Sequence, residues 1–112
     1  MNITRNGLME LFVDTLQKCG MHLLEKDDAY IGYCIFEEFD TGAVSFLHND
    51  TLQKLKTANL INENVSQKSS ELRSKFMKLQ NTDQWNVNSV KRSKAWREIL
   101  ELSDEIKSLM EI

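Results

Sequence analysis

The sequence contains no proline and only four glycines in 112 residues. Proline and glycine interrupt regular elements and form most tight turns, so their scarcity favours long helices over a many-turned β-fold. No apolar run approaches the roughly 20 residues that a membrane-spanning helix needs. A chain of this length can bury one hydrophobic core. We therefore expect a mostly α-helical bundle that forms a single domain over residues 1–112, without a membrane as partner.

Cysteine is also scarce, because Cys19 and Cys34 are the only two in the chain. Their spacing matches no set of metal ligands, and both lie among apolar residues, as reduced core cysteines do. The N-terminus lacks the basic, apolar and small-residue succession of a signal peptide. The sequence therefore predicts two free, buried thiols and a cytoplasmic location.

Residues that commonly carry chemistry are few. His22 and His48 are the only histidines, and Asp50 beside His48 would complete only two ligands of a metal site. There is no glycine-rich phosphate loop and no nucleophile motif. We expect no enzymatic activity, no metal and no cofactor.

The most hydrophobic stretch runs from Tyr30 to His48 and contains both tyrosines and three of the five phenylalanines. Such a stretch belongs in a core. Three acids interrupt it: Glu37, Glu38 and Asp40. Because a buried carboxylate without a partner is costly, these side chains must emerge where the stretch meets solvent, or form pairs.

Charge is distributed unevenly along the chain. Residues 1–50 carry nine acids against three bases, whereas residues 51–112 carry eight acids against eleven bases. An acidic surface steers association with a basic partner. The candidate binding residues are the three acids of the apolar stretch together with the acids that flank it in sequence: Glu37, Glu38, Asp40, Asp27, Asp28 and Asp50.

Apolar residues at three- and four-residue steps predict helices in several places. The expected helices cover residues 3–19, 62–80 and 90–111, with one or two short helices over residues 43–61. Thr4 or Asn6 could cap the first helix, and Gly20 could end it in the left-handed conformation. Asn62 is the expected cap of the helix that follows it.

Two interpretations of residues 21–40 remain open. One is a helix capped by Asp27 or Asp28 that runs to about Phe39 and is stopped near Gly42. The other is a small β-hairpin over residues 21–37, because tyrosine, isoleucine and phenylalanine favour strands. We prefer the helix, since the rest of the chain offers few strands to complete a sheet. In the following segment, Asn49 or Asp50 could cap a short helix.

Two features of the sequence weakly indicate binding to nucleic acid. A basic cluster precedes the last helix, formed by Lys91, Arg92, Lys94 and Arg97. These bases could hold phosphate, but we prefer the interpretation that they solvate the start of a helix or pair with Glu98 and Glu101. The segment Leu52–Leu79 reads as helix, turn, helix, but its second helix begins with Asn62, Glu63 and Asn64 where base-reading residues would be needed. A helical DNA-binding or regulatory module is the alternative function, and we do not expect nucleic acid as a partner.

Three segments together resemble a known group of proteins: Cys34–His48 (CIFEEFDTGAVSFLH), Ser70–Phe76 (SELRSKF) and Trp96–Lys107 (WREILELSDEIK). They are similar to small bacterial immunity proteins of contact-dependent growth inhibition and related polymorphic toxin systems. The resemblance extends from about residue 25 onward. It implies a protein that binds a cognate toxin domain, often a nuclease, and blocks it. These proteins vary in fold, so the resemblance specifies neither the structure of residues 21–40 nor the residues that contact the toxin.

The charge of the chain agrees with that role. Many nucleases have basic clefts for phosphate, and an acidic inhibitor can occupy such a cleft by imitating the charge of the substrate. We therefore expect an immunity protein that neutralises a basic nuclease toxin by direct binding through its acidic residues.

Overall fold

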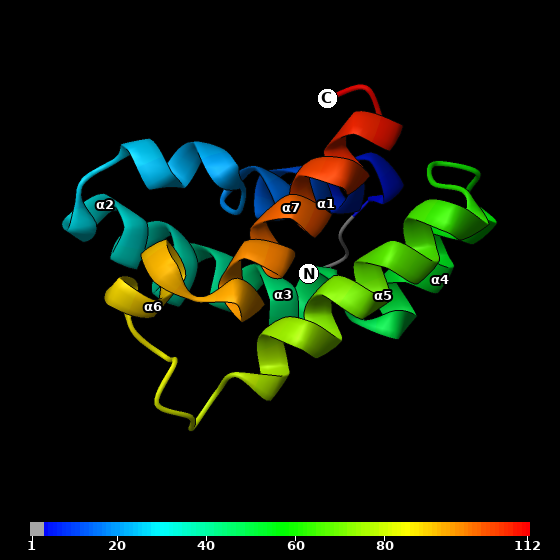
Figure 1. The fold of residues 1–112 in the computed structure, drawn as a ribbon. Helices are drawn as coiled ribbons and strands as arrows, with labels where there is room; N and C mark the ends of the chain where they lie inside the picture. The colour runs from blue at the N-terminus through cyan, green and yellow to red at the C-terminus, as the bar shows by residue number, and fades with distance from the viewer. Residues whose placement is uncertain (1–3) are drawn as a thin grey trace.

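The computed structural model describes residues 4–112, and all regular structure in that part of the chain is helical (Figure 1). The α-helices are α1 (Arg5–Gln17), α2 (Asp28–Gly32), α3 (Asp40–Phe46), α4 (Asn49–Thr57), α5 (Glu63–Lys78), α6 (Val87–Arg92) and α7 (Lys94–Leu109). A 3₁₀ helix spans Met21–Glu25 and a π-helix spans Tyr33–Phe39. The expected mostly α-helical fold is confirmed. Residue 3, where the first helix was expected to begin, lies outside the described residues.

The hairpin considered for residues 21–37 is wrong. Asp27 caps α2 by accepting a hydrogen bond from the Tyr30 backbone N–H at 2.8 Å. The helix then continues through the π-helix into α3, because the junction residues keep helical backbone angles. We call residues 28–46 the central helix. The propensity of aromatic and β-branched residues for strands is overridden here by burial against neighbouring helices.

A wide turn in the middle of the central helix explains its unusual apolar pattern. The Asp40 backbone N–H donates to the Ile35 carbonyl, five residues back, as in a π-helix. Ile31, Ile35, Phe39 and Ala43 are fully buried at four-residue steps. The wider turn lets side chains four residues apart remain on one face over this length, so the helix buries a continuous stripe.

Gly42 does not end the central helix, contrary to expectation. It is buried within α3, where a Cβ atom would lie 2.3 Å from the Thr15 Oγ1 of α1. Glycine is therefore needed at this position for the close approach of two helices rather than for a turn.

Several predicted helix starts are confirmed, and one is corrected. Thr4 caps α1 through a 3.0 Å bond from the Gly7 N–H, and Asn62 caps α5. The cap of α4 is His48, rather than Asn49 or Asp50. Its backbone is extended, and its Nδ1 accepts from the Asp50 N–H at 3.1 Å. Histidine is not among the preferred capping residues, so the sequence indicated the neighbouring Asn49 or Asp50 as the cap.

The expected last helix, residues 90–111, is divided in two. Ser93 has an extended backbone, ends α6 and caps α7. Helix α7 lies in front of α1 and beside α5 in Figure 1, and it contacts both. Its buried Trp96 belongs to an aromatic cluster in which neighbouring ring centroids are 4.8–5.9 Å apart. The cluster comprises Phe36, Phe39, Phe76, Trp85 and Trp96.

The end of α1 is fastened to α7 by polar side chains. Gly20 has φ 165°, which is extended rather than left-handed, so the expected C-terminal signal is wrong. Instead, the hydroxyl of Ser103 and the amine of Lys107 each lie 2.8 Å from the Cys19 carbonyl. The Met21 N–H donates to Asp104 at 3.0 Å. These side chains from α7 satisfy backbone groups that the end of a helix leaves without partners.

Both cysteines are buried and free, as expected. Burial raises the pKa of the Cys19 thiol to about 12. No helix within residues 4–112 combines the length and the apolar character required to cross a membrane.

Candidate partner-binding surface

The central helix presents apolar side chains to solvent on its outer face. Tyr30, Tyr33 and Val44 are 46%, 47% and 50% exposed. Among the described residues, the other large hydrophobic side chains with comparable exposure are Leu109 and Ile112, near the C-terminus. Exposed apolar groups that gather on one element indicate an interaction surface more strongly than scattered ones do.

The opposite side of the same helix is firmly packed. Ile31, Ile35 and Phe39 are fully buried and contribute to the core. The outer face is therefore displayed on a rigid support, so binding through it would cost little conformational entropy. We call Tyr30, Tyr33, Glu37, Glu38 and Val44 the outer face of the central helix.

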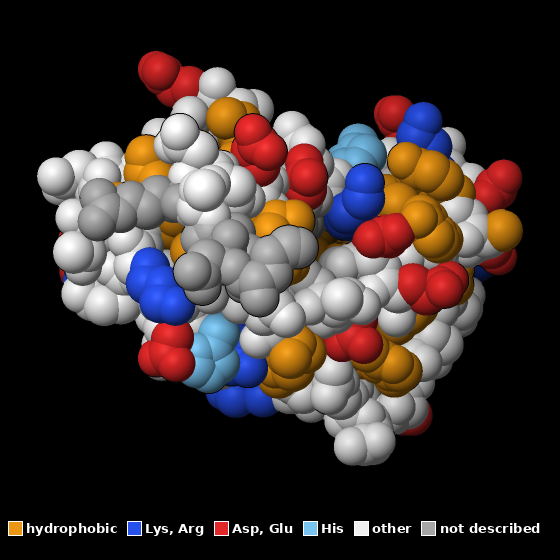
Figure 2. All heavy atoms as spheres, turned by 180° about the vertical axis from the view of Figure 1, so that it is seen from behind, with side chains coloured by type: hydrophobic (Ala, Val, Ile, Leu, Met, Phe, Trp, Pro, Cys, Tyr) orange, Lys and Arg blue, Asp and Glu red, His pale blue; other side chains and the backbone are white. Residues whose placement is uncertain are grey.

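Two of the expected acids lie on this surface. Glu37 is exposed, and Glu38 is half-buried. The Tyr33 hydroxyl donates a hydrogen bond to the Glu38 carboxylate, and this bond raises the pKa of Tyr33. The Lys26 ammonium lies 5.9 Å from the ring centroid of Tyr30, within the range of a cation–π contact. Figure 2 shows acidic and hydrophobic side chains interspersed over the right-hand part of the molecule, the side on which α2 lies.

The other expected acids have partners within the protein. Asp27 caps α2, and Asp28 forms a 2.9 Å ion pair with Lys91 of α6. Asp40 accepts a 3.0 Å hydrogen bond from the Gln80 side chain, beyond the end of α5. These contacts fasten the central helix to its surroundings.

The six acids do not form one continuous rim. The central helix spans 19 residues and is therefore about 28 Å long. Asp27 and Asp28 stand at its beginning, whereas Asp50 follows its end and lies in the first turn of α4. Of the predicted residues, the structure places Glu37 and Glu38 on the same helix face as the exposed Tyr33, and Asp27 beside the exposed Tyr30, from whose backbone N–H it accepts a hydrogen bond. Asp28, Asp40 and Asp50 have other surroundings.

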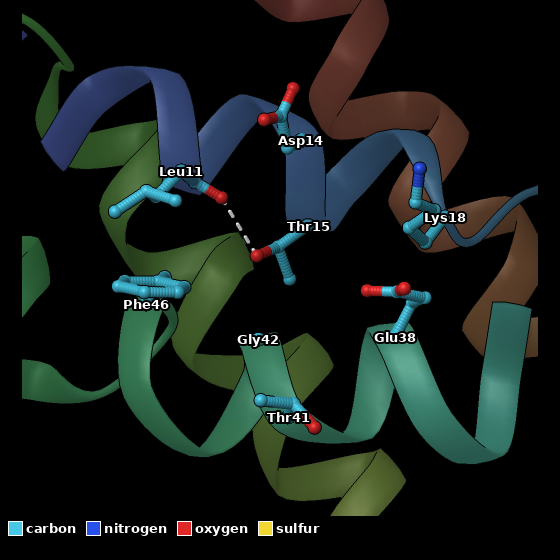
Figure 3. A pocket seen from close by; sticks show the side chains of 8 residues that line it. All are labelled: Leu11, Asp14, Thr15, Lys18, Glu38, Thr41, Gly42 and Phe46. Carbon is cyan, nitrogen blue, oxygen red and sulfur yellow. Dashed lines mark hydrogen bonds between the residues drawn. The ribbon is translucent and has the colours of Figure 1, made fainter. Parts of the chain in front are cut away.

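A groove of about 220 Å³ lies between α1 and the central helix, beside the outer face (Figure 3). Its lining comprises Leu11, Asp14, Thr15, Lys18, Glu38, Thr41, Gly42 and Phe46. Thr15 is only 4% exposed and donates its hydroxyl hydrogen to the Leu11 carbonyl at 2.8 Å. In Figure 3 the Glu38 carboxylate is turned toward Thr15, whereas the charged ends of Asp14 and Lys18 point away from the central helix.

Sequence reasoning missed the exposed tyrosines and the groove. It assigned Tyr30 and Tyr33 to the core because the whole stretch is apolar. The spacing of the residues could have revealed the exposed face, since residues 30, 33, 37 and 44 alternate along the helix with the buried residues 31, 35, 39 and 43. The π-helix obscured that rhythm, because it breaks the 3.6-residue period. The contribution of α1 to the groove depends on tertiary packing.

Other charged surfaces are largely neutralised. In the trough between α5 and α7, Lys68 pairs with Glu105 at 3.0 Å, and Lys75 lies 3.8 Å from Glu98. In the basic cluster, Arg97 lies 4.0 Å from Glu101, one of the two pairings that the sequence suggested.

The α4–α5 pair has no basic character at the start of its second helix. Glu63 opens α5 and pairs with Lys56 of α4. Lysine and arginine are the residues that neutralise phosphate charge, and the start of this helix carries an acid instead. Within residues 4–112, no three histidine, cysteine, aspartate or glutamate side chains lie close enough to hold a metal ion.

Comparison of the chain with protein-family models, with curated proteins and with solved structures found no match.

Proposed function

We propose that this protein is an immunity protein that binds a cognate bacterial toxin domain, a basic nuclease, and blocks it by direct contact. The observation that supports the proposal most is the outer face of the central helix, where exposed tyrosines stand beside Glu37 and Glu38 on a rigidly packed element. The resemblance of three segments to immunity proteins supports the same role.

The apolar part of this surface would supply affinity. Tyrosine is enriched among the residues that dominate binding energy, because a large ring buries much area with few rotatable bonds. Tyr33 has already lost part of its freedom through its hydrogen bond to Glu38. Less entropy therefore remains to be lost when a partner covers it.

The acidic part would supply speed and selectivity. Glu37 and Glu38 lie in the half of the chain that carries nine acids against three bases. A negative surface accelerates encounter with a basic nuclease domain and disfavours acidic partners. Because the role consists of binding, it requires no catalytic group and no cofactor in this chain. The two free thiols agree with a cytoplasmic location, where a nuclease toxin would act.

The proposal can be tested with the gene that neighbours the one encoding this chain. The C-terminal domain of the protein that this neighbouring gene encodes is expressed alone and together with the present protein, and cell survival is measured. We expect survival only in co-expression, and a one-to-one complex with salt-sensitive association from the purified domains. Loss of viability despite co-expression, or failure of the purified domains to bind, would refute the proposal. Salt-dependent binding to duplex DNA would support the alternative of a DNA-binding module.

A further inference from the structure

The groove beside the outer face has the size of a site for one side chain. At about 220 Å³ it is smaller than the roughly 300–1,000 Å³ of pockets that hold small molecules. It adjoins the proposed contact surface directly, because Glu38 lines the groove and also accepts the hydrogen bond of the exposed Tyr33. A partner docked on the outer face could therefore insert a side chain here.

Two polar groups of the groove lining, the Thr15 hydroxyl and the Glu38 carboxylate, can accept hydrogen bonds. The only hydrogen of the Thr15 hydroxyl is donated to the Leu11 carbonyl, so the lone pairs of this buried oxygen are left for an incoming donor. The Glu38 carboxylate is turned toward Thr15 in Figure 3 and is held by the Tyr33 hydroxyl. A donor-only group fits such a lining, whereas a carboxylate would be repelled.

The remaining walls suit an aliphatic stem. Leu11 and Phe46 contribute apolar surface from α1 and α3, and Gly42, against which Thr15 packs closely, forms part of the floor. Long basic side chains bury their methylene groups against such surfaces while their charged ends meet polar groups. Lys18 does not occupy the groove, because its ammonium points away from the central helix.

We propose that this groove receives one arginine side chain of the partner protein, with its guanidinium bound to Glu38 and Thr15. This inference rests on the proposed function, because it names the side chain that the basic toxin domain would insert into the groove. Two acceptors on different helices match the planar, five-donor guanidinium better than the compact ammonium of lysine.

The test uses blocked arginine, N-acetyl-arginine methylamide, as a probe in an NMR titration of the full chain. The neutral citrulline analogue serves as the control ligand. We expect saturable shifts of the Thr15 and Gly42 amide signals with the arginine probe and weak, unsaturated shifts with the citrulline probe. Glu38→Gln should weaken arginine binding by roughly tenfold, because a charge-assisted hydrogen bond is lost. Glu25→Gln removes the same charge from an exposed residue that does not line the groove, and should leave binding unchanged within about twofold.

Three outcomes would overturn the assignment: equal shifts with both probes, an equal loss in Glu25→Gln, or shifts confined to residues outside the groove. Thermal melting of both variants separates loss of binding from loss of structure. The probe needs no toxin, so its failure is distinguishable from failure of the proposed function. A toxin domain that binds the wild-type protein and Glu38→Gln equally would refute the groove and leave the inhibitor role intact.

Discussion

The contact between α1 and the central helix predicts an unusual effect of Gly42→Ala. In most helices this substitution stabilises by up to about 1 kcal/mol, because alanine has the higher helix propensity. Here the added Cβ would lie 2.3 Å from Thr15 Oγ1, 2.7 Å from Cγ2 and 2.9 Å from Cβ. Overpacking of this kind costs about 1–3 kcal/mol. Because three atoms are crowded, we expect a net loss of about 1–2 kcal/mol and a Tm lower by about 5–10 °C.

A matched control lies in the same helix. A Cβ at Gly32 would lie 3.4 Å from a methyl group of Val87, which is an ordinary contact. Gly32→Ala should therefore be neutral or stabilising by up to about 1 kcal/mol. Urea denaturation followed by circular dichroism measures both variants against the wild-type protein.

A double-mutant cycle tests the cause. Thr15→Ala removes two of the three crowded atoms, so Gly42→Ala should cost less in that background than in the wild-type protein. Additive effects, or a Gly42→Ala protein as stable as Gly32→Ala, would refute the close approach of α1 and the central helix.

Three further predictions concern the core and the surface. Burial raises the pKa of Cys19 to about 12. The unfolded thiol ionises near pH 9 while the folded one stays protonated, so the free energy of unfolding should fall between pH 9 and about 12, and fall less in Cys19→Ala. Ser69 is fully buried and its hydroxyl lacks a hydrogen-bond partner among the described residues, whereas the Ser103 hydroxyl reaches the carbonyl oxygens of residues 16 and 19. Ser69→Ala should stabilise by about 1 kcal/mol and Ser103→Ala should destabilise by about 1–3 kcal/mol; chemical denaturation giving the reverse order would contradict both assignments. Glu37→Lys with Glu38→Lys should slow association with the toxin domain several-fold at low salt in stopped-flow measurements, with little change in Tm, whereas an unchanged rate would exclude this surface from steering.

Local signals in the sequence predicted the helices well. Hydrophobic spacing placed most of the helices, and Thr4, Asp27 and Asn62 were among the expected caps, because a short polar side chain before a periodic segment acts within one turn. The segment Asn81-Thr82-Asp83 lies between α5 and α6, and Asn81 adopts a positive φ of 63°, which asparagine tolerates better than most residues.

Features that depend on packing were not predictable from one sequence. Gly42 looked like a helix terminator, since nothing local reveals that Thr15 approaches it. The same limitation applies to the binding surface. Spacing alone did not show that Tyr30 and Tyr33 face solvent, or that Asp28 and Asp40 are engaged by Lys91 and Gln80.

The affinity of the toxin domain for surface variants tests the central claim most directly. Tyr33 and Leu109 are equally exposed, at 47% and 45%, but only Tyr33 lies on the outer face of the central helix. By isothermal titration calorimetry, Tyr33→Ala should bind about 30-fold more weakly than the wild-type protein, as expected for loss of about 2 kcal/mol at an interface hot spot. Leu109→Ala should bind like the wild-type protein. Wild-type affinity in Tyr33→Ala, or a greater loss in Leu109→Ala, would contradict binding through the central helix.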